Sequence, residues 1–448
     1  MAKLQPTPVA ATAGNAEWLA RSRAAVWHPC TQMKRHETLP LVPIARAHGA
    51  WLVDFDGRRY LDAVSSWWVN LFGHAHPKIN AAIASQLGDL EHVMLAGFTQ
   101  RPVVELSERL AALAPGRLGH CFYGSDGASA VEIALKMSFH YWRNRGETGK
   151  TGFIALERGY HGETLGALSV TDVALFRDAY APLLRQHAVL PSPDARLARN
   201  GQTTRDHALT AAAALEAHLA EHHRGLAALI VEPLVQGAAG MAIYDPAYLE
   251  RARALCTRYG VHLIADEIMT GFGRTGTMFA CEQAGIAPDF LCLSKGLTGG
   301  YLPLSVVLTT DEVYAAFYDD ELARGFLHSH SYTGNALACR AALAVLDLFR
   351  DEDVIVANRA RAATLGAMAQ PLAAHPKVSA FRHLGMIWAF EVDSRREDFA
   401  SWCFTAALQR EMLLRPIGHT VYWMPPYCLS DDEMALLAAR TLEIVECA

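Results

Sequence analysis

Two short stretches decide the fold: Ile264-Ala-Asp-Glu-Ile268 and Asp289-Phe-Leu-Cys-Leu-Ser-Lys-Gly-Leu-Thr-Gly-Gly300. Each stretch contains an apolar run, and the runs lead to Asp266 in one case and to Lys295 in the other. Short apolar runs without alternation are typical of strands in a parallel sheet that helices cover on both faces. The two stretches therefore predict an α/β fold in which an acid and a lysine lie at the ends of neighbouring buried strands.

Lys295 is notable because the chain uses few lysines. It has seven, at 3, 34, 78, 136, 150, 295 and 377, against thirty-three arginines. A guanidinium stays charged, whereas an amine can lose its proton and react. The alternative is an ordinary surface lysine, which this composition disfavours. We predict that Lys295 forms a Schiff base with pyridoxal phosphate and that Asp266 binds the pyridinium nitrogen of the same cofactor.

The overall composition indicates a globular enzyme that acts on small molecules. The chain has 448 residues, and its 51% hydrophobic content supports cores for more than one domain. Forty basic and forty-six acidic side chains give a net charge of −6 without a long block of one sign. This pattern argues against a nucleic-acid-binding surface and against a polybasic membrane patch.

The cysteines and the N-terminal residues predict a soluble cytoplasmic protein. Nine cysteines are scattered without a C-x-x-C pair, which favours reduced thiols in a reducing compartment. The first residues lack the apolar core of a signal peptide, and no apolar run is long enough to span a membrane. We also expect no metal site, because His328 and His330 have no acid or cysteine at ligand spacing.

The order of apolar runs predicts two domains. Strands are expected near 120–123, 152–156, 227–231, 261–265, 290–293 and 304–308, within a large cofactor-binding domain over residues 66–335. Residues 1–65 and 336–448 are expected to form one small α+β domain, with a hairpin around Asp56-Gly57 and a strand at 386–392. A loose tail is predicted over residues 1 to about 15, and residues 195–224 are an insertion or a surface helix.

Two further segments follow predicted strands and have residues suited to the same cofactor. Gly124-Ser-Asp-Gly-Ala-Ser-Ala-Val-Glu132 begins a helix, so Ser125, Asp126 and Gly127 are candidates to hold a phosphate at the helix N-terminus. The alternative is a simple N-cap. Tyr160 follows the next strand, and its ring is a candidate to lie against a planar cofactor.

These residues give the sequence a resemblance that covers nearly the whole chain. It is similar to the class III aminotransferases, which are fold-type I pyridoxal-phosphate enzymes. The matching segments are Gly73-His-Ala-His-Pro77, Ser125-Asp-Gly127, Tyr160-His-Gly162, Glu232-Pro233, Ala265-Asp-Glu267, Gly271-Phe-Gly-Arg-Thr-Gly276, Ser294-Lys-Gly296 and Thr333-Gly-Asn-Ala-Leu-Ala338. The resemblance implies a mainly parallel seven-stranded sheet in the large domain and a small domain built from both termini.

Within this family the sequence resembles most closely the members that act in biotin biosynthesis. The segments that carry this likeness are Val26-Trp-His-Pro29, Ser65-Ser-Trp-Trp68, Leu414-Arg-Pro-Ile417 and Met424-Pro-Pro-Tyr427. The likeness implies that S-adenosylmethionine donates its α-amino group, through pyridoxal phosphate, to 8-amino-7-oxononanoate. The expected product is 7,8-diaminononanoate.

The same resemblance implies the residues that contact substrate. It assigns Trp67 to the substrate and Arg415 to a substrate carboxylate, for which a forked guanidinium is suited. Arg274 is a weaker second candidate. If the tryptophan pair lies on a strand, Trp67 and Trp68 face opposite sides and one of them lines the pocket. Tyr160 and Lys295 are expected to contact substrate as well as cofactor.

The segment Phe326-Leu-His-Ser-His-Ser-Tyr-Thr-Gly-Asn335 matches a loop that reaches the active site of a neighbouring subunit. The resemblance implies that Ser331 and the backbone of His330 contact the neighbour's phosphate, and that Ser329 contacts substrate. We therefore expect a homodimer with shared active sites.

Several positions depart from the family pattern and bear on specificity. Cys30 stands where a substrate-binding tyrosine is common, Glu163 where an aspartate is common, and Ser331 where a threonine is common. Ala238 replaces the acid that glutamate-using relatives carry, which disfavours a glutamate donor. The main alternative is a broader ω-aminotransferase that takes its amino group from lysine, an amine or a β-amino acid. An aminomutase or racemase, and a catalytically silent homologue, are weaker alternatives.

Overall fold

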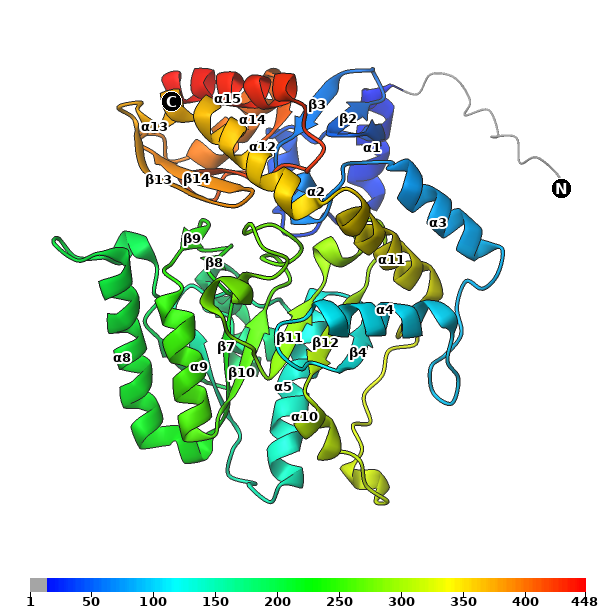
Figure 1. The fold of residues 1–448 in the computed structure, drawn as a ribbon. Helices are drawn as coiled ribbons and strands as arrows, with labels where there is room; N and C mark the ends of the chain where they lie inside the picture. The colour runs from blue at the N-terminus through cyan, green and yellow to red at the C-terminus, as the bar shows by residue number, and fades with distance from the viewer. Residues whose placement is uncertain (1–13) are drawn as a thin grey trace.

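The structure is a computed structural model that describes residues 14–448 (Figure 1). Most of the predicted N-terminal tail lies outside the described residues, and helix α1 (Asn15–Ala25) begins at its expected end. At the centre is a seven-stranded sheet. Its strands, in spatial order, are β4 (His120–Gly124), β12 (Ser305–Thr309), β11 (Phe290–Leu293), β10 (His262–Asp266), β7 (Leu226–Val231), β5 (Gly152–Leu156) and β6 (Ala188–Leu190).

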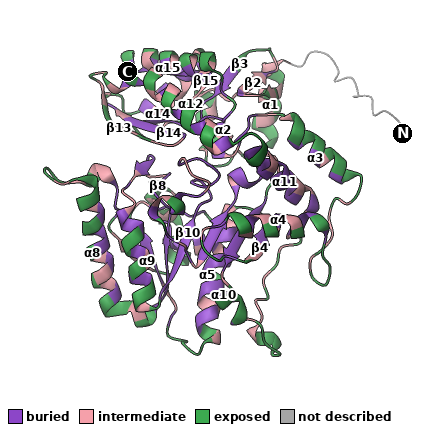
Figure 2. Cartoon of the chain, viewed as in Figure 1, coloured by how far each residue is buried: buried purple, intermediate pink, exposed green. Residues whose placement is uncertain are grey.

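Strand direction makes this sheet mainly parallel, so the predicted fold class is confirmed. The neighbours β11, β10, β7, β5 and β6 run parallel, and β12 alone is antiparallel to the strands on both of its sides. Every residue of β7, β10, β11 and β12 is buried. Figure 2 shows this burial concentrated on the central strands. Two-sided burial explains why the sequence has apolar runs rather than alternation there.

The six predicted strands of the large sheet are present, and one further strand was missed. β6 has only three residues, all of them partly exposed. Three apolar residues at a sheet edge are too few to predict a strand. Helix α5 (Gly127–Asn144) packs on β7, β10, β11 and β12, while α8 (Thr204–His222) packs on α9 (Ala247–Tyr259). The segment 195–224 is therefore mainly a helix.

The two ends of the chain lie side by side, as Figure 1 shows for the blue and the orange-to-red segments. The predicted hairpin is formed by β2 (Trp51–Asp54) and β3 (Arg59–Asp62), and β1 (Ile44–His48) pairs with β2 on its other side. The short strand β15 (Met412–Leu413) pairs in parallel with β3. A second sheet contains β13 (Val378–Leu384), β14 (Ile387–Val392) and β16 (Thr420–Trp423). These pairings are compatible with one small domain, whose boundaries at 65 and 336 stay a prediction.

The remaining elements connect or cover these sheets. They are α3 (Pro77–Leu87), α4 (Arg101–Leu113), α6 (Leu165–Ser169), α7 (Ala174–Arg177), β8 (Val235–Gln236), β9 (Ala242–Ile243), α10 (Asp311–Ala315), α11 (Ala336–Asp351), α12 (Val354–Met368), α13 (Gln370–Ala373), α14 (Phe399–Gln409) and α15 (Asp431–Glu446). Among the described residues, no helix combines the length and the apolar character needed to cross a membrane.

The tryptophan pair does not lie on a strand, so that interpretation of the sequence is wrong. Residues Ser65–Trp68 form the single helical turn α2, and all four have positive φ angles, from 44° to 76°. The two rings are therefore separated by a left-handed turn and not by the alternation of a strand. The local sequence contains no glycine, the usual signal for this conformation.

We predict that Leu61→Ala destabilises the protein by about 2–5 kcal/mol, because it leaves a cavity where β3 meets β15. Leu61 is completely buried. The measurement is urea-induced unfolding at a fixed protein concentration. Val356→Ala is the control: Val356 is 53% exposed, and its loss should change stability by no more than about 0.5 kcal/mol. Equal effects of the two substitutions would contradict the packing described for β3.

Candidate active site

Lys295 and Asp266 meet in one cavity at the carboxyl ends of β11 and β10. The cavity has a volume of about 320 Å³. Its walls come from several elements and comprise Trp68, Asp126, Gly127, Ala128, Tyr160, His161, Gly162, Glu163, Glu232, Asp266, Ile268, Met269 and Lys295. The structure thus brings together the lysine, the acid, the helix start and the tyrosine that the sequence singled out separately. The position fits the rule that ligands bind beyond the carboxyl ends of parallel strands.

The Lys295 amine lies beside an aromatic ring and near two carboxylates. Lys295 follows β11 in a left-handed conformation with φ 44°, and its Nζ is 4.7 Å from the centroid of the Trp68 ring. Burial lowers the pKa of Lys295 from its usual value, although the negative charges of Asp266 and Glu232 oppose the shift. A lowered pKa increases the fraction of unprotonated amine near neutral pH, which is the nucleophilic form.

Asp266 is fixed by hydrogen bonds on both carboxylate oxygens. Oδ2 lies 2.7 Å from Nδ1 of His161, and Oδ1 accepts from the backbone N–H of Ile268 at 3.1 Å. Asp266 is 4% exposed. A buried carboxylate held in this way is suited to a cationic ring nitrogen. The sequence did not reveal the role of His161, whose only signal was its place within the Tyr160-His-Gly162 segment.

Glu232 links two walls of the cavity and was not predicted as a site residue. Its two oxygens accept from the backbone N–H groups of Tyr160 at 3.0 Å and Gly237 at 2.9 Å. Burial raises the pKa of Glu232 to about 7. The signal available in the sequence was a charged residue directly after the fully apolar strand β7. Its hydrogen bonds show that Glu232 holds the backbone of Tyr160 in place.

Tyr160 lines the cavity next to a second glutamate. Its hydroxyl donates to Oε1 of Glu163 at 2.9 Å. Burial, followed by the charge of Glu163, raises the pKa of Tyr160. Cys30 is exposed and has φ 51°.

The start of α5 offers backbone N–H groups to the cavity. Asp126 is the N-cap, and its Oδ1 accepts from the N–H of Ser129 at 2.9 Å. The N–H groups of the first helical residues have no intrahelical partner, so those of Gly127 and Ala128 suit an anion. A Cβ at Gly127 would lie 3.0 Å from Ile268. Ser125 does not line the cavity; its hydroxyl lies 3.0 Å from Nδ1 of His330.

The tryptophan pair forms two different contacts. Trp68 is buried, lines the cavity and donates from Nε1 to the Tyr422 hydroxyl at 3.1 Å. Trp67 is 41% exposed, and the Arg415 guanidinium lies 3.9 Å from its ring centroid. This distance allows a cation–π interaction between the Arg415 guanidinium and the face of the Trp67 ring. The substrate roles of Trp67 and Arg415 stay predictions.

Arg274 is placed differently from its predicted substrate role. It is 1% exposed, donates to the carbonyl of Pro425 at 2.8 Å, and lies 4.9 Å from the centroid of the Tyr427 ring. Arg274 does not line the cavity. Because the guanidinium is enclosed by protein, this placement disfavours substrate binding and indicates that Arg274 holds neighbouring backbone segments together.

The loop from Phe326 to Asn335 does not enter the cavity of its own chain. His330 contacts Ser125, and the carbonyl of Ser331 lies 2.8 Å from Nε2 of His92. Neither these two loop residues nor Ser329 lines the cavity. Their roles at the phosphate and substrate of a neighbouring subunit therefore stay predictions.

The residues of the cavity fit pyridoxal phosphate. They include a partly buried amine with a lowered pKa, a buried carboxylate, an aromatic ring and a helix N-terminus. The volume is in the range of small-ligand pockets. Lys295 would bind the aldehyde carbon, Asp266 the ring nitrogen, and the N–H groups of Gly127 and Ala128 the phosphate.

Comparisons with known proteins agree with this geometry. The aminotransferase class-III family model matches residues 32–445. Adenosylmethionine-8-amino-7-oxononanoate aminotransferase of Helicobacter pylori is 47% identical, covering 94% of this chain and 96% of its own. The enzyme of that name from Synechococcus elongatus is 41% identical, and the match covers 95% of this chain and 99% of that enzyme.

Solved structures show the same likeness. The crystal structure of adenosylmethionine-8-amino-7-oxononanoate aminotransferase from Methanocaldococcus jannaschii has a TM-score of 0.90 and 34% identity, covering 96% of this chain and 99% of that one. A pyridoxal-phosphate-bound amine transaminase from an uncultivated Pseudomonas species has a TM-score of 0.87 and 32% identity, covering 94% and 98%.

We predict that Lys295 reacts with a small amine-directed reagent at lower pH than Lys34, Lys78 or Lys377 when bound small molecules have been removed. The reason is its lowered pKa, which leaves more free amine at a given pH. The measurement is site-resolved mass spectrometry after brief labelling across a pH series. A Lys295 profile centred at or above 10.5, the ordinary lysine pKa, would contradict the assignment.

Proposed function

Because this chain belongs to the class III aminotransferases, we propose that it transfers the α-amino group of S-adenosylmethionine to 8-amino-7-oxononanoate, giving 7,8-diaminononanoate in biotin biosynthesis. The observation that carries this conclusion is that relatives named for that activity match this chain over nearly its full length. The cavity that contains Lys295 and Asp266 supports it. Pyridoxal phosphate is the cofactor; when bound, it carries the amino group and stabilises negative charge on the substrate carbon.

Lys295 moves protons between the substrates and the cofactor. Its Nζ removes the proton from Cα of S-adenosylmethionine and later returns a proton to C7 of 8-amino-7-oxononanoate. The lowered pKa keeps this amine close to the range in which it can both accept and donate. The Trp68 ring covers one side of this amine.

The other cavity residues orient the reactants. Asp266, fixed by His161, keeps the ring nitrogen of the cofactor protonated. Arg415 pairs with a substrate carboxylate, and its stacking on Trp67 limits the directions that the guanidinium can take. The exposed face of Trp67 is then the surface on which the substrate lies.

A broader ω-aminotransferase is the less favoured alternative. Amine and ω-transaminases share the fold with TM-scores of 0.87 to 0.92, but they are 26% to 32% identical to this chain. The sequence relatives at 37% to 47% identity have the biotin-pathway name. Position 238 is also an alanine, whereas the resemblance associates an acidic residue there with the use of glutamate as amino donor. The fold therefore allows the alternative, whereas the sequence favours the specific reaction.

The experiment that tests the function offers the purified enzyme one amino donor at a time. We expect S-adenosylmethionine to abolish the visible absorbance of bound pyridoxal phosphate and 8-amino-7-oxononanoate to restore it. Lysine, glutamate and alanine should leave the absorbance unchanged. Lys295→Ala is the control and should bind the cofactor without multiple turnovers. Restoration of the absorbance only by pyruvate after an amine donor would instead identify a general ω-aminotransferase.

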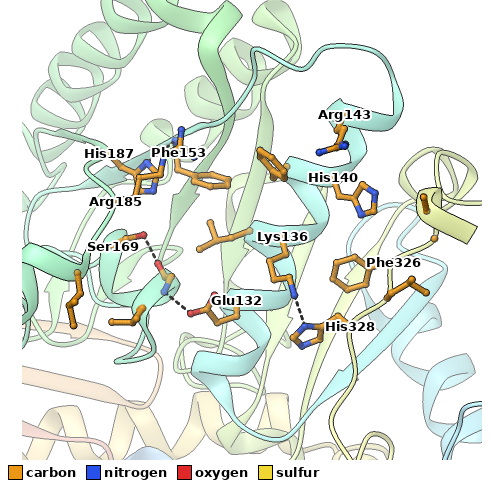
Figure 3. Close-up of a pocket in the computed structure, with 18 residues that line it drawn as sticks. Glu132, Lys136, His140, Arg143, Phe153, Ser169, Arg185, His187, Phe326 and His328 are labelled. Carbon is orange, nitrogen blue, oxygen red and sulfur yellow. Dashed lines mark hydrogen bonds between the residues drawn. The ribbon is translucent and has the colours of Figure 1, made fainter.

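We also propose a homodimer with shared active sites, which the family resemblance implies. Several large apolar side chains are exposed on the large domain: Leu165 is 52% exposed, Leu183 65%, Leu327 73% and Tyr332 68%. Three of these, Leu165, Leu183 and Leu327, line a second cavity of about 730 Å³ beside α5. Figure 3 shows Phe326 and His328 of the loop on one side of this cavity, opposite Ser169 and Arg185. Apolar surface of this kind is typical of an interface.

Shared active sites predict complementation between two inactive variants. Lys295→Ala removes the amine of its own site, and Ser331→Asp places a negative charge where the loop is proposed to meet the neighbour's phosphate. A hybrid dimer of the two contains one site with Lys295 and Ser331 both intact. We expect the hybrid to recover activity that both parents lack, measured after separating it by differential tags. An inactive, correctly assembled hybrid would contradict the shared arrangement.

A cytoplasmic location is proposed from the cysteines. All nine lie within the described residues and are free thiols, five of them buried. Free thiols in this number are compatible with a reducing compartment.

A further inference from the structure

The turn that presents both tryptophans has an unusual backbone. Ser65, Ser66, Trp67 and Trp68 have φ angles of 49°, 44°, 72° and 76°. Four consecutive residues with a side chain thus adopt the left-handed conformation, which glycine adopts readily and other residues disfavour. A strained backbone persists only where its surroundings enforce it. Some neighbouring group must therefore hold this turn in place.

Asp62 is the group that reaches the middle of the turn. It is fully buried. Its Oδ1 accepts from the backbone N–H of Val64 at 3.2 Å and of Ser66 at 3.0 Å. Its Oδ2 accepts from the Ser66 hydroxyl at 2.8 Å and lies 3.0 Å from Nε2 of His74. One carboxylate therefore binds both the backbone and the side chain of Ser66.

The partners of this carboxylate are themselves anchored. The backbone of His74 exchanges two hydrogen bonds with Gly49, of 2.7 and 3.0 Å. On the other side of the turn, the Ser65 hydroxyl donates to the carbonyl of Met424 at 2.8 Å, and the Met424 N–H donates to the carbonyl of Ala63 at 2.9 Å. These contacts fix the ends of the turn, while those of Asp62 fix its centre.

The turn sets the position of two walls of the active site at once. Trp68 covers the amine of Lys295 at 4.7 Å, and Trp67 contacts the guanidinium of Arg415 at 3.9 Å. Relaxation of the turn toward ordinary φ angles would swing both rings. Asp266 ends β10 and Lys295 follows β11, and neither is among the hydrogen-bond partners of Asp62, which are Val64, Ser66 and His74. A change in the turn should therefore affect the substrate more than the attachment of the cofactor.

We propose that Asp62 is a positioning residue that determines substrate binding by holding the left-handed turn Ser65–Trp68. The identity of the substrates rests on the proposed function, whereas the link between Asp62 and the turn does not. The competing explanation is that Asp62 only stabilises the small domain, as Asp54 does. Asp54 is 2% exposed and accepts hydrogen bonds from the backbone N–H groups of Asp56 and Arg58, and from the Tyr60 hydroxyl.

Two independent changes should weaken the turn, and a third should restore it. Asp62→Ala removes the carboxylate. Ser66→Val keeps Asp62 but removes the hydroxyl and places a β-branched residue at φ 44°. Ser66→Gly, added to Asp62→Ala, allows the left-handed conformation without a side-chain penalty. Ser66 is only partly buried, so Ser66→Val keeps the test open if Asp62→Ala fails to fold. Asp54→Ala is the matched control for loss of a buried aspartate.

We expect Asp62→Ala and Ser66→Val to lower kcat/KM for S-adenosylmethionine about tenfold or more, mainly through KM, because the binding surface is displaced. Both should keep a full complement of bound cofactor by absorbance. Adding Ser66→Gly to Asp62→Ala should recover a measurable part of kcat/KM. Asp54→Ala should lower the melting temperature and leave KM unchanged.

Hydrogen exchange of the peptide covering residues 62–70, measured without substrate, gives a readout independent of turnover. Exchange should accelerate in Asp62→Ala and in Ser66→Val but not in Asp54→Ala. Wild-type KM in a folded Ser66→Val, or no recovery with glycine at 66, would overturn the proposal. If the unmodified enzyme used no S-adenosylmethionine, the proposed function would fail while the exchange data still tested the turn.

Discussion

The structure depends on one electrostatic constraint: an amine must be partly shielded from water beside carboxylates without being locked into an ion pair. Lys295 satisfies it because burial lowers its pKa while the charges of Asp266 and Glu232 moderate the change. The carboxylates themselves are occupied by other donors, His161 for Asp266 and two backbone N–H groups for Glu232. The amine therefore stays free to react, and both carboxyl groups are held in position.

The order and direction of the sheet strands bring the charged groups of the site together. Asp266 ends β10 and Lys295 follows β11, and these strands are adjacent and parallel, so both groups emerge at the same edge. Backbone hydrogen bonding between the strands fixes their register before any side chain is considered. Glu232 follows β7, the other neighbour of β10, and joins the same edge. Three consecutive strands thus deliver three charged groups to a cavity that loops alone would define less firmly.

Much of this arrangement could be predicted from the sequence because it depends on strong local signals. Apolar runs marked the buried strands, and the lone lysine and the acid at their ends marked the cavity. The rest depends on long-range contacts. The three residues of β6 are too few to mark a strand. The left-handed turn at Ser66 contains no glycine as a signal, and its ends depend on contacts with distant residues such as Met424. Arg274 looked like a substrate ligand, yet packing against Tyr427 encloses it.

The same reasoning explains how one fold serves several amino donors. Structures with TM-scores near 0.9 include enzymes with the biotin-pathway name and amine transaminases, so the sheet and the lysine cannot by themselves select the substrate. Selection must lie in side chains that can change while the cofactor site stays fixed. In this chain the candidates for such side chains are Trp67, which lies near the N-terminal part of the small domain, and Arg415, which lies in its C-terminal part. Their contact at 3.9 Å requires the two ends of the chain to fold together. β3 ends five residues before Trp67 and β15 ends two residues before Arg415, so the pairing of these strands helps to bring the two side chains together.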